Sequence, residues 1–196
     1  SGDFCTASRV HHTDLAAWAM NEQQPVTAFG MGGRAAPYDE SHGDCFDHDA
    51  IIYEYADGRK LFAFLIVQPN CYVEVSDIIM GTRGKIDLQE ESRKNQKRLH
   101  RDGKQVDPYQ VEQDELFASL RSGNPINNGR YMAESALTGI MGQMATYTGR
   151  KIDRDEALAA GNIFGPAECD FTTDPPVAPR PDGTYPVRVP GFTKLE

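Results

Sequence analysis

Two histidines and an aspartate lie close together near the start of the chain, in the segment ASRVHHTDLAAWAM. Asp14 follows His11 by three residues, so on a helix the two side chains share a face and can touch. An imidazole oriented by a carboxylate is a common arrangement for proton transfer. Because HxxD is also a frequent pattern on the polar surface of ordinary amphipathic helices, the spacing leaves both interpretations open.

A helix over the stretch Ser8 to Met20 would position these side chains. Ser8 is a suitable N-cap, and Pro25 shows that the helix has ended by then. The apolar residues that recur with a helical period are Val10, Leu15, Trp18 and Ala19. We therefore expect this stripe to face the core.

A second group of polar side chains lies in the segment between Arg34 and Asp49. It contains His42, Asp44, Cys45, Asp47 and His48, all of them residue types that can bind a divalent metal. No fixed ligand spacing is present, so the sequence predicts no metal here and favours a solvated or substrate-facing loop. The preceding run Gly30–Gly33 lacks GxGxxG and a Walker lysine, so it does not indicate a phosphate site.

The middle of the chain reads as consecutive strands joined by tight turns. Asp57-Gly58 is a hairpin signal between two β-rich runs. The predicted strands cover residues 25–29, 51–55, 60–67, 71–80 and 85–88. Short connections of this kind favour an antiparallel sheet over a doubly wound one.

Three helices are predicted after the strands, the first opened by Asp107-Pro108, the second at about Tyr131–Thr148 and the third at Arg154–Ala160. The predicted fold class is therefore α+β, a predominantly antiparallel open sheet with helices packed on one face. The predicted domain covers residues 1–160, and the proline-rich residues 161–196 form an extended tail that wraps it. An uncovered apolar sheet face usually finds a partner, so we expect a homo-oligomer through that face.

Composition excludes several classes of function. The formal net charge of −9 argues against binding to a nucleic-acid backbone. No apolar run approaches the roughly 20 residues that a membrane helix requires. The four cysteines are scattered without a CxxC pair and are interpreted as reduced thiols. The chain starts without a Met or a leading strand, which suggests a piece whose upstream part is absent.

Three motifs carry a resemblance to a known family. RVHHTDLAAW resembles the segment that opens the C-terminal domain of the glucose–fructose oxidoreductase / inositol dehydrogenase (Gfo/Idh/MocA) family. GTRGKIDL is similar to a strand–turn–strand of that family, and LTGIMGQMATYTGRKI is similar to the closing helix of a bacterial branch. The resemblance implies a substrate-binding and oligomerisation domain whose Rossmann partner would hold NAD or NADP, with no cofactor bound by this chain itself.

The resemblance also implies roles for residues. The family histidine that accepts the proton of a sugar or polyol hydroxyl matches His11, and Arg9, His12 and Asp14 would contact substrate. The family often has an aspartate four residues before that histidine, where this chain has Ala7. Loss of that aspartate keeps open a non-catalytic carbohydrate-binding module or a purely structural oligomerisation module. A bacterial protein of this kind is expected in the cytoplasm rather than the periplasm.

Overall fold

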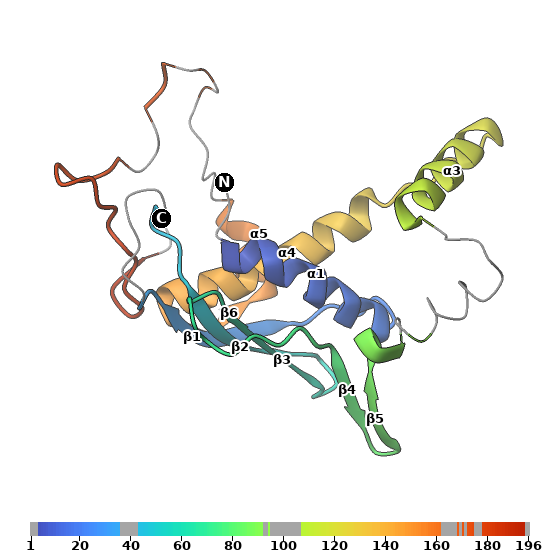
Figure 1. Cartoon of the computed structure of the whole chain (residues 1–196), viewed down its shortest axis with the longest axis horizontal. Coiled ribbons are helices and arrows are strands. Elements are labelled where there is room, and N and C mark those ends of the chain that lie inside the picture. The colour runs from blue at the N-terminus through green and yellow to red at the C-terminus, as the bar shows by residue number, and fades with distance from the viewer. Residues whose placement is uncertain are drawn as a thin grey trace. The chain divides into compact units, whose positions relative to one another are not determined.

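The computed structural model describes residues 4–35, 43–91, 94, 107–161, 168, 170, 172–174 and 178–194. Contacts between residues divide the chain into two compact units, Ser1–Val73 with Ala133–Glu196 and Glu74–Met132. The first unit holds the sheet and the helices that cover it (Figure 1). Its elements are α1 (Phe4–Ala19), β1 (Thr27–Gly33), β2 (His48–Glu54), β3 (Lys60–Ile66), most of α4 (Gly129–Thr148), β6 (Ile152–Asp153) and α5 (Arg154–Ala160).

The four strands of the first unit form one open antiparallel sheet in the order β3-β2-β1-β6. The predicted hairpin between β2 and β3 is confirmed, and Gly58 supplies its positive φ of 86°. The short strand β6 was not predicted because two residues carry no periodicity. Its place beside β1 is secured by a hydrogen bond of 2.9 Å from Arg154 N to Val26 O.

One face of this sheet is buried and the other is open, as the α+β prediction requires. Ile51 and Tyr53 of β2 point to the helical side, where α1 and α4 lie (Figure 1). The core cluster there consists of Ala28, Ile51, Tyr53, Met141, Met144, Ala145, Ile152 and Ala157. Alternate residues point to the opposite face, and among them Phe64 is 74% exposed.

Helix α1 differs from its prediction in both its start and its buried side. It begins at Phe4, so Ser8 lies inside the helix instead of capping it. The buried residues are Arg9, Thr13 and Ala17, four residues apart, whereas Trp18 is 71% exposed. The physical reason is that a buried ion pair of Arg9, described below, orients the helix in place of the expected apolar stripe.

The second unit contains β4 (Ile78–Gly81), β5 (Gly84–Asp87) and α3 (Pro108–Arg121). The two strands pair only with each other in the described chain, so the expected strand over 71–80 in the main sheet is wrong. Asp77 closes this hairpin by accepting hydrogen bonds from Leu88 N and Gln89 Nε2, both at 2.8 Å. Helix α3 begins as predicted, with the Asp107 carboxylate accepting from Tyr109 N.

Across the described ranges, no helix combines the length and apolar character needed to cross a bilayer.

Two glycines of α4 differ sharply in the space around them. A Cβ atom placed on Gly142 would lie 2.8 Å from Ile51 Cδ1 and would overlap the Tyr53 hydroxyl. A Cβ atom on Gly139 would meet only Thr6 and Val10, at an ordinary 3.7 Å. The absence of a side chain at Gly142 therefore lets α4 approach β2 closely.

Gly142→Ala should lower the free energy of unfolding by about 1–3 kcal/mol, since overpacking a filled core strains its neighbours. Gly139→Ala is the matched control and should raise it by about 0.5–1 kcal/mol, because alanine loses less backbone entropy in a helix. Urea denaturation of both variants measures the difference. Equal effects of the two substitutions would show that α4 does not press on β2 at Gly142.

Candidate active site

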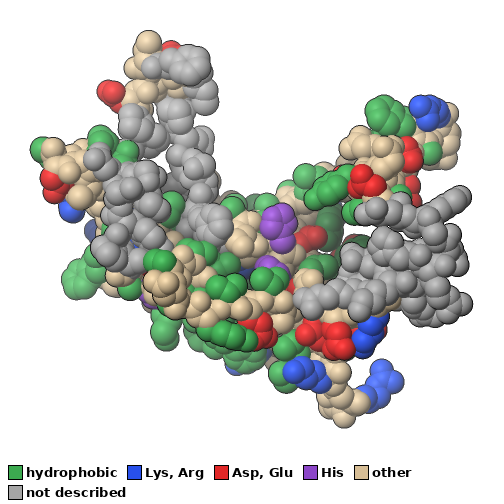
Figure 2. All heavy atoms as spheres, in the orientation of Figure 1, with side chains coloured by type: hydrophobic (Ala, Val, Ile, Leu, Met, Phe, Trp, Pro, Cys, Tyr) green, Lys and Arg blue, Asp and Glu red, His purple; other side chains and the backbone are tan. Residues whose placement is uncertain are grey.

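The two histidines of α1 differ in exposure, and the carboxylate expected to contact His11 bonds to another helix; histidine side chains are visible at the surface in Figure 2. His11 is exposed and His12 is half-buried. Asp14 Oδ1 accepts a hydrogen bond of 2.7 Å from Ser135 Oγ of α4. The His11 side chain makes no hydrogen bond or ion pair with any residue that the structure describes, so its ring is accessible but not oriented.

Arg9, which the family resemblance assigns to substrate, is the most buried charged residue of α1. Its side chain is 2% exposed and forms an ion pair with Asp49 of β2, while Nη2 also lies 3.4 Å from Thr6 Oγ1. The pair joins α1 to the centre of the sheet. Contact of Arg9 with a ligand remains a prediction, and the contacts shown give it a structural role.

Burial controls the titration of the groups around this ion pair. It raises the pKa of the Asp49 carboxyl above its ordinary value, although the Arg9 guanidinium opposes the change. Burial likewise raises the pKa of Tyr53 to about 12, again against the effect of Arg9. The Tyr53 phenol, whose ordinary pKa of 10 already keeps it neutral at physiological pH, therefore adds no charge to the core.

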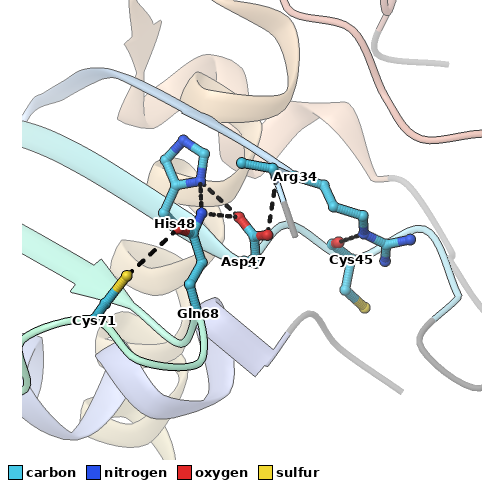
Figure 3. Close-up of polar contacts among 7 residues, drawn as sticks. Arg34, Cys45, Asp47, His48, Gln68 and Cys71 are labelled. Atoms are coloured by element: carbon cyan, nitrogen blue, oxygen red, sulfur yellow. Dashed lines mark hydrogen bonds and ion pairs between the residues drawn. The ribbon is translucent and has the colours of Figure 1, made fainter. Parts of the chain in front are cut away.

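A carboxylate-oriented imidazole does occur in the chain, at the end of the main sheet (Figure 3). His48 Nδ1 lies 2.6 Å from Asp47 Oδ1. Because an ionised carboxylate only accepts, this contact assigns the ring proton to Nδ1 and leaves the lone pair on Nε2. The Asp47 side chain is 1% exposed whereas that of His48 is 40% exposed, so a buried acceptor orients a ring that solvent can reach.

Two chain segments fix Asp47 in place, residues 33–35 and Val67. Its main chain bridges β1 and β3, through hydrogen bonds of 2.9 Å from Asp47 N to Gly33 O and from Val67 N to Asp47 O. Its carboxylate also accepts from Ala35 N at 2.9 Å. Groups held by regular elements keep their geometry better than groups on free loops.

Gln68, which follows β3, completes the cluster (Figure 3). Its Nε2 donates to Asp47 Oδ1 at 2.9 Å and lies 3.1 Å from His48 Nδ1. Its Oε1 accepts from Cys71 Sγ at 3.7 Å, which fixes the orientation of the amide. Sequence reasoning placed Asp47 and His48 in a polar group but had no signal for Gln68, which only the hairpin brings alongside them.

The other predicted features of this region are partly outside the described residues. His42 lies outside the described residues. The Cys45 carbonyl oxygen accepts a hydrogen bond of 2.8 Å from Arg34 Nε. Among the residues that the structure does describe, no group of three His, Cys, Asp or Glu side chains is placed to hold a metal ion. The run Gly30–Gly33 lies within β1 and pairs with β2.

Comparison with known proteins gives little further information. No protein-family model matches the chain, and no curated protein matches it. A solved structure titled as that of a probable dehydrogenase from Thermotoga maritima is similar at 13% identity and a TM-score of 0.44. The match covers 76% of this chain and 48% of the dehydrogenase, so the chain spans about half the length of that protein. A similarity at this level assigns no function.

Arg9→Met should lower the free energy of unfolding by about 3–5 kcal/mol, because it leaves the Asp49 carboxyl buried without its cation. Arg59→Met is the control, since Arg59 pairs with Asp57 in solvent and its loss should cost at most about 1 kcal/mol. The double variant Arg9→Met/Asp49→Leu should recover most of the loss. Denaturant midpoints test this, and an Arg9→Met protein as stable as the Arg59→Met protein would contradict it.

Proposed function

We propose that this chain is the substrate-binding and oligomerisation domain of an NAD(P)-dependent oxidoreductase that acts on CH–OH groups of sugars or polyols. Two independent features support the proposal. The first is the motif resemblance over RVHHTDLAAW and the residues of α4. The second, which carries the proposal, is that the histidine-bearing helix lies on an open antiparallel sheet whose far face exposes apolar side chains among the described residues.

The dinucleotide would be held by another domain. The glycine run Gly30–Gly33 is a paired strand, so it offers no loop of free backbone N–H groups for a pyrophosphate. A nicotinamide, when bound, accepts a hydride from a carbinol carbon. The part left to this chain is to bind the polyhydroxy substrate, orient it and take up the proton of the reacting hydroxyl.

The residues of α1 differ in how they could serve this function. His11 and His12 can meet a ligand at the helix surface. Asp14 is held by Ser135, and Arg9 acts by fixing the helix on the sheet. The proposed contacts of Arg9, His12 and Asp14 with substrate, and proton acceptance by His11, come from the family resemblance.

The open sheet face suits self-association. Met31 of β1 and Phe62 and Phe64 of β3 are exposed on either side of β2, and together with Phe29, Ala50 and Ile52 they line a hollow of about 290 Å³. A contiguous apolar surface of this kind on a folded domain usually marks an interface. A second copy of the chain is the partner that we propose for it.

A non-catalytic module of the same fold is the second candidate. The observation in its favour is Ala7, which stands on α1 where the family has the aspartate that orients the histidine. Such a module would bind a sugar or assemble subunits without hydride transfer.

Turnover by the full-length protein separates the two candidates. Incubated with NAD or NADP and a panel of sugars and polyols, it should reduce the nicotinamide, which absorbance follows directly. This chain alone should not reduce the nicotinamide, because the proposal assigns dinucleotide binding to another domain. Absence of turnover across the panel, with sugar binding retained, would favour the non-catalytic module, and reduction of NAD by this chain alone would contradict the proposed division of roles.

Phe64→Glu should weaken self-association at least about tenfold, because a carboxylate buried in an interface costs more than 1.4 kcal/mol. Phe192→Glu is the control, since Phe192 is 85% exposed and lies outside the sheet. Sedimentation equilibrium measures both. An oligomer unaffected by Phe64→Glu would place the interface elsewhere.

A further inference from the structure

A small pocket lies where the turn after α1 meets the β2–β3 hairpin. It has a volume of about 230 Å³ and is lined by Gln23, Gln24, Tyr55, Ala56 and Asp57. Tyr55 continues the alternation of buried residues that Ile51 and Tyr53 begin on the helical side of the sheet. None of the lining residues borders the hollow of the open face, so the two cavities are separate.

The Tyr55 hydroxyl is the polar group that the fold leaves for this pocket. Tyr55 is only 4% exposed, although it lines the pocket. Within the described part of the chain its hydroxyl makes no hydrogen bond, and unlike the Tyr53 hydroxyl it is not sealed from solvent. A polar group held at the edge of the core is expected to bond to water, or to a ligand that replaces the water.

Arg59 fixes two other lining groups. Its Nη2 donates to Gln23 Oε1, and its Nε donates to Asp57 Oδ2 at 2.7 Å. Its guanidinium carbon also lies 5.6 Å from the centre of the Tyr55 ring. Because the guanidinium occupies the oxygen of the Gln23 amide, the NH₂ group of that amide is left to donate. Arg59 likewise balances the charge of Asp57, so these groups together carry no net charge.

Gln24 presents a second amide in the same manner. Its Oε1 accepts a hydrogen bond of 2.9 Å from Thr138 Oγ1 of α4. Neither the Gln23 nor the Gln24 amide nitrogen has a hydrogen-bond partner within the ranges that the structure describes. Two amide NH₂ groups and one phenol O–H therefore border a single cavity, together with a carboxylate whose oxygens can accept further bonds.

This set of groups fits a neutral ligand that carries several hydroxyl groups. A hydroxyl both donates and accepts, so it can bond to an amide, a phenol or a carboxylate. An anion would meet the donors but also the Asp57 carboxylate, and the lining residues include no Lys or Arg to balance it. A volume of about 230 Å³ equals that of about eight water molecules at about 30 Å³ each, which suits a single ring.

We propose that this pocket binds one ring of a neutral polyol or monosaccharide, with the Tyr55 hydroxyl and the two glutamine amides as donors and the Asp57 carboxylate as an acceptor. The pocket differs from the site proposed on α1. His11 does not line it, and it lies eight residues before the helix end at Ala19, about 12 Å along the axis. Binding here needs neither a dinucleotide nor turnover, so the inference goes beyond the proposed function and does not depend on it.

Titration of the ¹⁵N-labelled chain with myo-inositol and with glucose tests the proposal. In ¹H–¹⁵N correlation spectra, the side-chain NH₂ signals of Gln23 and Gln24 should shift and saturate at millimolar concentrations of at least one of these probes. Tyr55→Phe should raise the Kd about three- to tenfold, because it removes one hydrogen bond. Tyr53→Phe is the matched control and should leave the Kd unchanged, since Tyr53 loses the same atom two residues away and does not line the pocket.

Sodium acetate is the anionic probe in the same titration. The inference is wrong if neither polyol gives saturable shifts of the two amide signals, if acetate binds more tightly than both polyols, or if Tyr55→Phe leaves the Kd unchanged. Thermal unfolding shows whether each variant is folded. If Tyr55→Phe is not, Gln23→Ala removes an amide from an exposed position and should raise the Kd by a similar factor. Because these signals report on the pocket and not on the nicotinamide, failure here leaves the proposed function to its own turnover test.

Discussion

The ion pair between Arg9 and Asp49 is the interaction on which the rest of the first unit depends. Both side chains are almost fully buried, and they join the first helix to the central strand of the sheet. Breaking a buried pair leaves an uncompensated charge, so its geometry restricts how α1 can rotate on the sheet. That restriction turns Thr13 and Ala17 inward and leaves Trp18 and the histidines outward.

Strand β2 carries a buried ion-pair carboxylate on one face and an imidazole on the other. Asp49, Ile51 and Tyr53 point toward the helices, and His48 and Ala50 point away from them. Alternation along the strand thus separates the buried carboxylate of Asp49 from the imidazole of His48, which precedes it by a single residue in sequence. Close packing of α4, which Gly142 permits, keeps the helical side of the sheet filled.

Local signals in the sequence predicted much of the fold. The Asp57-Gly58 turn identified the β2–β3 hairpin, and the periodicity of Tyr131–Thr148 identified most of α4. The strand that completes the sheet, Ile152–Asp153, was missed because two residues carry no periodicity. The rotation of α1 was missed for a similar reason: the partner of Arg9 lies 40 residues away and no periodicity reveals it.

The candidate site was less predictable than the fold. Spacing of three residues favoured His11 with Asp14, because helical neighbours are the pairs that sequence can indicate. Asp47 and His48 are adjacent in sequence, where side chains normally diverge, and they meet only because Asp47 lies just before β2 with its backbone held by β1 and β3. Gln68 contacts them only because the β2–β3 hairpin brings the end of β3 alongside the start of β2.

Native-state amide hydrogen exchange is the most direct test of the claim that the Arg9–Asp49 pair holds the first helix on the sheet. In Arg9→Met, the amides of α1 should lose more of their protection than the amides of β2, because the helix loses its buried anchor while the strand keeps its partners on both sides. An α1 that stays as well protected as in the wild-type protein would contradict the account.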